Sequence, residues 1–303
     1  MALNISIWQN TLVENFYPDN SFATKSVDDS AYVKARKVII PGAGKPSNVK
    51  RNRTVKPATV NTRTDNALEY EIDELTSDPI YIPDIDTVEL SYDKRSSIIS
   101  TDRTQLQNEA HVNLLERWGA GVPATNVLLT TGTVECAAHT SETATGKRKC
   151  ITRKDLLAIT TRMDADNVPE EGRYILLDAY MYADLLADLT ESDKWMLQNS
   201  ANAQKGIVGN LWGLNVMKRS KVLRVKSDKT LLSWDEEAVA GELAAALAWQ
   251  EQSVSRALGE VKMFDSTNNP MYYGDIYSFL IRTGGSVRRY DKKGIYLLAE
   301  AAK

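Results

Sequence analysis

The sequence predicts a mixed α+β fold, because stretches of helical and of strand periodicity alternate along its 303 residues. Apolar residues recur at helical spacing between residues 96 and 118, whereas apolar and polar residues alternate between residues 67 and 75. Hydrophobic residues make up 43% and charged residues 25% of the chain, which is ordinary for a globular protein. A chain of this length and composition can bury a core without disulfides or metal ions.

Residues 1–30 predict an arm rather than a compact unit, because they show little regular period. Their apolar anchors fall at roughly helical spacing: Trp8, Leu12, Val13, Phe16 and Tyr17. We expect this arm to pack against something else.

The next two segments carry opposite charges. Residues 31–64 contain nine basic and no acidic residues, and residues 65–93 contain ten acidic and no basic residues. The pattern predicts one strand over residues 33–40 and a second over residues 67–75, with Leu68, Tyr70 and Ile72 on one face of the second. Pro, Gly, Asn, Thr and Lys dominate the stretch between them.

These segments indicate a long two-stranded projection. An isolated two-stranded ribbon buries too little surface to be stable, so we expect it to lie on a neighbour. The alternative is a solvated loop whose charge blocks have no partner.

A helix is predicted over residues 96–118, ended by Gly119, Gly121 and Pro123. Helix and strand then alternate from about residue 125 to 232. The expected features are a capping box at Thr152 and Asp155, a buried strand from Arg173 to Asp178, a helix over residues 179–189 and a glycine-punctuated strand over residues 206–219.

The C-terminal region predicts one more helix and two strands. Ser233 and Glu236 resemble a capping box, and the alanine-rich stretch that follows predicts a helix ending at Gly259. Strands are expected over residues 276–282 and 294–299.

The composition and motifs argue against several function classes. A net charge of −3 is unlike the basic excess of proteins that wrap nucleic acid. KVIIPGAGKPS is no phosphate loop, because Pro46 follows Gly44-Lys45 where Ser or Thr should ligate magnesium. The GxSxG, HExxH and dinucleotide-binding motifs do not occur. We therefore expect no enzyme, no cofactor and no catalytic residues.

A metal site is not expected either. Cys136, His139 and Cys150 are three candidate zinc ligands, but their spacing matches no zinc module, so a structural or incidental role is favoured. His111, within the long helix, is expected at a surface or interface. No signal peptide and no apolar run of about 18 residues is evident, so no membrane association is expected.

Three segments in order resemble major capsid proteins of tailed bacteriophages of the Hong Kong 97 type. They are VPEEGRYILLDAYMYADLLADL (168–189), GIVGNLWGLNVMKRS (206–220) and NNPMYYGDIYSFLIRTGGSVRRYDKKGIYLLAEA (268–301). The resemblance covers nearly the whole chain and rests on the order of these segments rather than on one motif.

This resemblance implies an L-shaped subunit with four parts. They are an N-terminal arm (1–30), an extended β-ribbon or E-loop (31–78), a peripheral domain with a long spine helix (79–124 and 233–303) and an axial domain (125–232). The subunits would form pentamers and hexamers of an icosahedral shell around double-stranded DNA.

The resemblance also implies partners and a location. Portal, scaffolding and cement proteins would bind the shell, and the packaged DNA would be held without sequence specificity. The protein would reside in the virion capsid after assembly in the bacterial host cytoplasm.

Function is then expected in subunit contacts. Our hypothesis places basic residues of the ribbon against an adjacent subunit: Lys45, Lys50, Arg51, Arg53 and Lys56. The acidic residues expected to take part are Glu69, Glu71, Asp73 and Glu74. Two alternatives remain, namely an encapsulin-type shell enclosing enzymes and a soluble α/β enzyme or binding protein.

Overall fold

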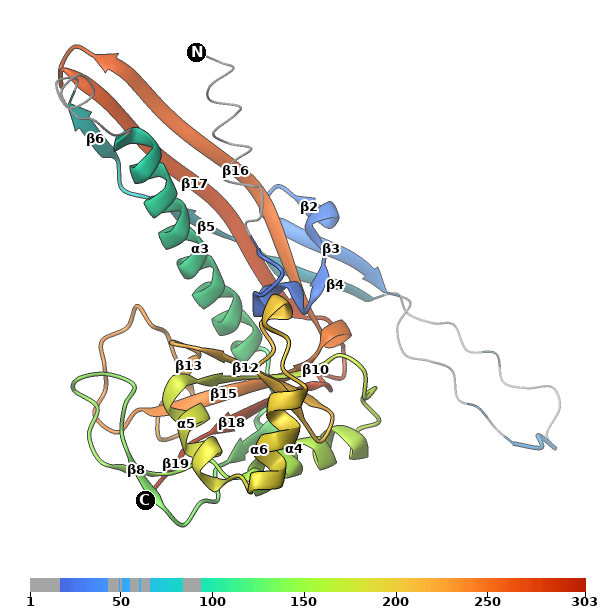
Figure 1. The fold of residues 1–303 in the computed structure, drawn as a ribbon. Helices are drawn as coiled ribbons and strands as arrows, with labels where there is room; N and C mark the ends of the chain where they lie inside the picture. Colours follow the sequence, from blue (N-terminus) through green and yellow to red (C-terminus); the bar gives the residue numbers. More distant parts are fainter. Residues whose placement is uncertain (1–16, 43–48, 50, 55–59, 61–65, 84–93) are drawn as a thin grey trace.

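The computed structural model describes residues 17–42, 49, 51–54, 60, 66–83 and 94–303. An elongated part, made of a long helix beside a long β-hairpin, extends from a compact part built around a central sheet (Figure 1). Among the described residues, no helix combines the length and apolarity needed to cross a membrane.

The elongated part is a five-stranded sheet with one helix along it (Figure 1). Its elements are α3 (Lys94–Ala120), β1 (Val27–Asp28), β5 (Asp73–Thr76), β6 (Ile80–Pro83), β16 (Val254–Asn269) and β17 (Gly274–Val287). β16 and β17 form the antiparallel hairpin; β1 pairs with β16, while β5 and β6 pair with β17.

Helix α3 follows the period seen in the sequence. Its buried residues Leu106, Ala110, Leu114 and Trp118 lie four positions apart and so share one face of the helix. This face packs on the hairpin, where Phe279 is buried beside Leu106 and Ala110. The predicted helix over residues 96–118 is confirmed.

The compact part is an eight-stranded sheet with order β11-β12-β10-β15-β13-β14, extended by β18 on β15 and by β7 on β18. The strands are β7 (Val127–Leu129), β10 (Arg173–Asp178), β11 (Gly209–Leu211), β12 (Leu214–Arg219), β13 (Leu223–Val225), β14 (Leu231–Leu232), β15 (Leu243–Gln250) and β18 (Ile295–Ala299). Helices α4 (Arg153–Ala165), α5 (Ala179–Asp188) and α6 (Glu191–Asn199) cover one face.

Several local predictions hold in this part. The Asp155 carboxylate accepts a hydrogen bond from the Thr152 backbone N–H at 2.8 Å, which confirms the capping box of α4. β10 has the predicted bounds, and all six of its residues are buried. Its last residue, Asp178, caps α5 by accepting from the Met181 N–H at 2.7 Å.

Two small sheets complete the described fold. One contains β8 (Glu135–Ala137), β9 (Lys147–Lys149) and β19 (Ala301–Ala302). The other contains β2 (Val33–Lys34), β3 (Lys37–Gly42) and β4 (Asn66–Glu71) and projects from the junction of the two main parts (Figure 1).

The predicted alanine-rich helix ending at Gly259 is wrong, because this segment forms β15 and the start of β16. Ser233 makes no capping box either: its hydroxyl donates to the Glu116 carboxylate at 3.0 Å. β15 is buried on both faces. Leu243, Ala245, Leu247 and Trp249 enter one hydrophobic cluster, whereas Ala244, Ala246 and Ala248 enter the other. Burial between two layers outweighs the helix propensity of alanine.

The strand pairing also changes the proposed domain division. β15 and β18 were assigned to the peripheral domain, yet they lie in one sheet with β10 of the axial segment. Within residues 233–303, we therefore group residues 243–250 and 295–299 with residues 125–232, and the β16–β17 hairpin with α3.

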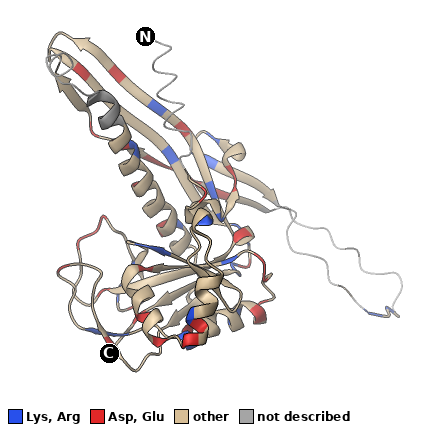
Figure 2. Cartoon of the chain, in the orientation of Figure 1, with Lys and Arg blue, Asp and Glu red and all other residues tan. Residues whose placement is uncertain are grey.

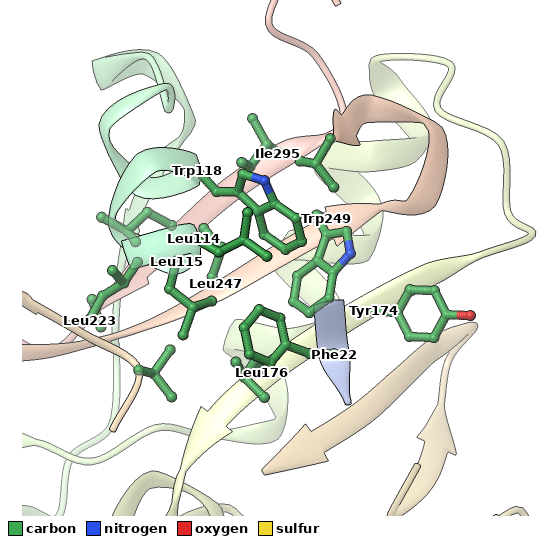
Figure 3. Packing of buried hydrophobic residues seen from close by; sticks show 14 of the residues in the cluster. Phe22, Leu114, Leu115, Trp118, Tyr174, Leu176, Leu223, Leu247, Trp249 and Ile295 are labelled. Atoms are coloured by element: carbon green, nitrogen blue, oxygen red, sulfur yellow. The ribbon is translucent and has the colours of Figure 1, made fainter. Parts of the chain in front are cut away.

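An aromatic cluster joins the elongated and compact parts (Figure 3). The rings of Trp118 in α3 and Trp249 in β15 lie 5.5 Å apart, and Phe22 of the arm packs edge-on against both. The Trp118 indole donates to the Ser255 carbonyl oxygen at 2.8 Å, and that of Trp249 to the Lys25 carbonyl oxygen at 2.8 Å. The described part of the arm thus packs on its own chain.

Substitution of Gly285 should disrupt this junction. A Cβ there would overlap the Ser255 carbonyl oxygen and the Leu114 side chain. We expect Gly285→Ala to lower the free energy of unfolding of the unassembled subunit by about 1–3 kcal/mol, measured by urea unfolding. Ser286→Ala, which adds no atom, is the control and should stay within about 0.5 kcal/mol. Equal stability of the two variants would contradict this packing.

His111 should make the attachment of the arm sensitive to pH. Burial, followed by the charge of Arg219, lowers the pKa of His111 from 6.5 to about 4, and its Nε2 lies 3.0 Å from the Ser21 hydroxyl. Between these two pKa values the unfolded chain binds more protons than the folded one. Stability should therefore fall as pH drops through this window, by on the order of 1–3 kcal/mol.

Urea unfolding at several pH values checks this, with His111→Phe as the comparison. The difference in stability between wild type and variant should change across the window and level off about one pH unit above 6.5, where the unfolded histidine is also neutral. A difference that does not vary with pH would show that His111 does not titrate as described.

Candidate interface surfaces

The β3–β4 pair has one inward and one outward face. The register places Lys37 opposite Glu71 and Ile39 opposite Glu69, all exposed. The alternate residues point inward: Val38 is fully buried against Ile72 and Ala257. Leu68, Tyr70 and Ile72 share this inward side, as the sequence pattern predicts.

The base of the pair is fastened to the hairpin. The Ser255 hydroxyl donates to the Tyr70 oxygen at 3.2 Å, and the Tyr70 hydroxyl donates to the Asp29 carboxylate at 3.4 Å. Burial raises the pKa of Tyr70, so the phenol stays protonated as a donor. The strand pair therefore leaves the junction in a fixed direction.

The structure describes only two of the five predicted basic contact residues. Arg51 and Arg53 are exposed. Lys45, Lys50 and Lys56 lie outside the described residues.

Acidic and basic residues lie on both the elongated and the compact part of the chain (Figure 2). Three of the four predicted acidic contact residues pair within the chain. Asp73 accepts from Asn113 at 2.9 Å and from the Arg117 Nε at 2.8 Å. Glu74 accepts from Arg282 at 2.9 Å and Arg36 at 3.3 Å. Glu71 lies 3.5 Å from Lys37.

Glu69 differs from these three. It is exposed and forms no ion pair within the described ranges. Its charge is therefore the one of the four most available to another molecule.

An apolar surface at the tip of the β16–β17 hairpin was not predicted from the sequence. In the turn, Met271 is 83% and Tyr273 81% exposed and Tyr272 is about half exposed; Phe264, further along β16, is also about half exposed. Tyr81 of β6 donates from its hydroxyl to the Tyr272 carbonyl oxygen at 2.5 Å, which fixes the turn. A cluster of exposed apolar residues on an ordered turn indicates an interaction surface. The NPMYYG sequence between two strands was the available signal.

A second exposed apolar group lies on the helices of the compact part. Trp195 of α6 is 70% and Tyr180 of α5 62% exposed. Such large aromatic residues are enriched at protein interfaces. The described residues therefore include exposed large aromatic side chains on both the elongated and the compact part.

An open cavity of about 750 Å³ lies beside the β8–β9 hairpin and contains Cys136, His139 and Cys150. Burial raises the pKa of both thiols, so neither is an activated nucleophile. The His139 Nε2 lies 2.8 Å from the Asp178 carboxylate. The Sγ atoms of Cys136 and Cys150 lie close to the Asp184 carboxylate.

No family model and no curated protein matches the sequence. Solved structures do match. The capsid of cyanophage P-SCSP1u is 18% identical with a TM-score of 0.61, over 90% of this chain and 86% of that one. The capsid of Ralstonia phage GP4 is 15% identical with a TM-score of 0.59, over 94% and 88%. The capsid of a native GTA particle is 11% identical with a TM-score of 0.60, over 94% and 91%.

At these identities the likeness establishes the fold. The chain has the fold of phage capsid subunits over nine-tenths of its length, which confirms the predicted Hong Kong 97-type fold class.

Proposed function

We propose that the chain is the major capsid protein of a tailed bacteriophage, a structural subunit and not an enzyme. The observation that carries the proposal is a capsid fold spanning 90% of this chain and 86% of a phage capsid subunit. Its exposed tip and projecting strand pair support the same conclusion, since surfaces of this kind need a partner.

In this proposal the principal partner is a second copy of the chain. Copies form pentamers and hexamers that close into an icosahedral shell around double-stranded DNA, in the virion, after assembly in the host cytoplasm. Portal, scaffolding and cement proteins are further proposed partners. A net charge of −3 supports a shell that encloses DNA without gripping it tightly.

The proposed contacts combine charge and apolar surface. Each exposed ion pair contributes only about 0–1 kcal/mol, so the basic residues near Arg51 and Arg53 chiefly select the partner surface and its orientation. Burial of the tip contributes roughly 25 cal/mol for each Å² of apolar surface removed from water. Repetition of these weak heterologous contacts by symmetry makes closure of the shell cooperative.

Electron microscopy of the expressed protein tests the proposal. Shells or capsomer rings are the expected result, and a uniform monomer would contradict it. Nucleic acid content then separates a DNA-containing phage shell from a compartment that encloses enzymes.

Charge reversal of the basic segment should block assembly. The variant combines Lys50→Glu, Arg51→Glu and Arg53→Glu, because like charges facing the acidic partner surface repel it. The control keeps the charge with Lys50→Arg, Arg51→Lys and Arg53→Lys. Sedimentation should show unassembled subunits for the first variant and shells for the second; normal shells from both would refute the role of these residues.

Substitution of two acidic residues should have different effects, one on the stability of the subunit and the other on assembly. Asp73→Ala leaves Arg117 and Asn113 without their acceptor and should destabilise the isolated subunit by about 1–2 kcal/mol. Glu69→Ala should leave urea unfolding unchanged but slow assembly, measured by light scattering. The reverse pattern would contradict the assignment of intrachain and interchain charges.

A further inference from the structure

Two cysteines and one carboxylate from three separate segments meet beside the β8–β9 hairpin. Cys136 lies in β8, Cys150 directly follows β9, and Asp184 lies in α5. The two Sγ atoms and a carboxylate oxygen all lie within 4.8 Å of one another. Cys150 is buried, while Cys136 and Asp184 are half-buried.

The strand register explains why the two thiols meet. Cys136 pairs with Arg148, and the Cys150 N–H donates to the Val134 carbonyl oxygen at 3.1 Å. Cys136 and Cys150 are therefore diagonal neighbours on one face of the hairpin. Helix α5, positioned by its Asp178 cap, brings Asp184 to that face from the other side.

A buried carboxylate supplies a second, independent observation. The Glu300 side chain is only 1% exposed. Its Oε1 lies 3.8 Å from the Cys136 Sγ, within reach of an S–H···O hydrogen bond, and 3.9 Å from the His139 Nδ1, and its Oε2 accepts from the Ala244 N–H at 3.3 Å. Burying a carboxylate this way is unfavourable unless a positive charge compensates it. His139 and Arg148 supply part of that charge, and a bound dication beside Cys136 would supply more.

We propose that Cys136, Cys150 and Asp184 bind one Zn²⁺ ion, with Glu300 or a water molecule at the fourth position. Two thiolates and a carboxylate form a ligand set that suits zinc. With Zn–S bonds of about 2.3 Å, tetrahedral ligands lie roughly 3.8 Å apart, so side-chain shifts of about 1 Å would close the site. The cavity of about 750 Å³ gives the ion access from solvent.

The site would fix a weakly packed part of the fold. Most residues of β8 and β9 are exposed or half-buried, so this small sheet has little core of its own. A metal ion would connect it to α5 and thus to the central sheet. Because the unfolded chain lacks the site, the free energy of binding would stabilise this region. The inference does not rest on the proposed function.

Titration of the reduced, metal-free full-length protein with Co²⁺ tests the proposal. We expect visible bands of tetrahedral cobalt with thiolate ligands, saturating at about one ion per chain, and displacement by Zn²⁺. Zinc should also raise the thermal unfolding temperature. The double variant Cys136→Ser, Cys150→Ser should lose the thiolate bands, and Asp184→Asn should bind at least about tenfold more weakly.

Glu142→Gln is the matched control, since Glu142 lines the same cavity outside the cluster. It should bind cobalt like the wild type, and circular dichroism should show all variants folded. Absence of thiolate bands in the reduced, folded wild type would overturn the proposal. So would a Cys136–Cys150 disulfide whose reduction leaves a protein that binds no metal, or Glu142→Gln weakening binding as much as Asp184→Asn.

Discussion

The packing of Trp118 against Trp249 sets the relation between the two parts of the molecule. Trp118 ends the buried face of α3, and its indole also donates to β16, so one side chain contacts the helix, the hairpin and the central sheet. Phe22 brings the arm to the same point. The direction of the elongated part is therefore set by a close-packed junction. Because close-packed interiors have low compressibility, this junction holds the two parts at a fixed angle. A subunit that repeats the same contacts around a shell needs such rigidity.

The charged residues fall into two groups: those that form ion pairs within the subunit and those that are exposed to other molecules. The Asp73–Arg117 and Glu74–Arg282 pairs fix β5 and the base of the projecting strands to α3 and β17. Outside these pairs, Glu69, Arg51 and Arg53 are exposed, and the apolar tip lies at the far end of the hairpin. In the proposed shell, the inner pairs orient the projection and the outer residues choose its partner.

Local sequence patterns predicted an element correctly where the residues within that element decide whether it is a helix or a strand. The Thr152–Asp155 box, β10 and the four-residue spacing of α3 could all be read from neighbouring residues. β15 could not, because its alanines favour a helix in isolation and become a strand only between two layers of core. The cluster of Cys136, Cys150 and Asp184 was missed for a similar reason, since Asp184 comes from a distant helix. The NPMYYG turn at the hairpin tip could be recognised in the sequence, but the exposure of its apolar side chains could not.

A reconstruction of assembled particles by cryo-electron microscopy would show whether the function of the chain resides in contacts between its copies. We expect the β3–β4 projection and the Met271–Tyr273 tip of every copy to be buried against neighbouring subunits. Particles in which both surfaces face solvent would contradict this expectation, even if the subunit fold were unchanged.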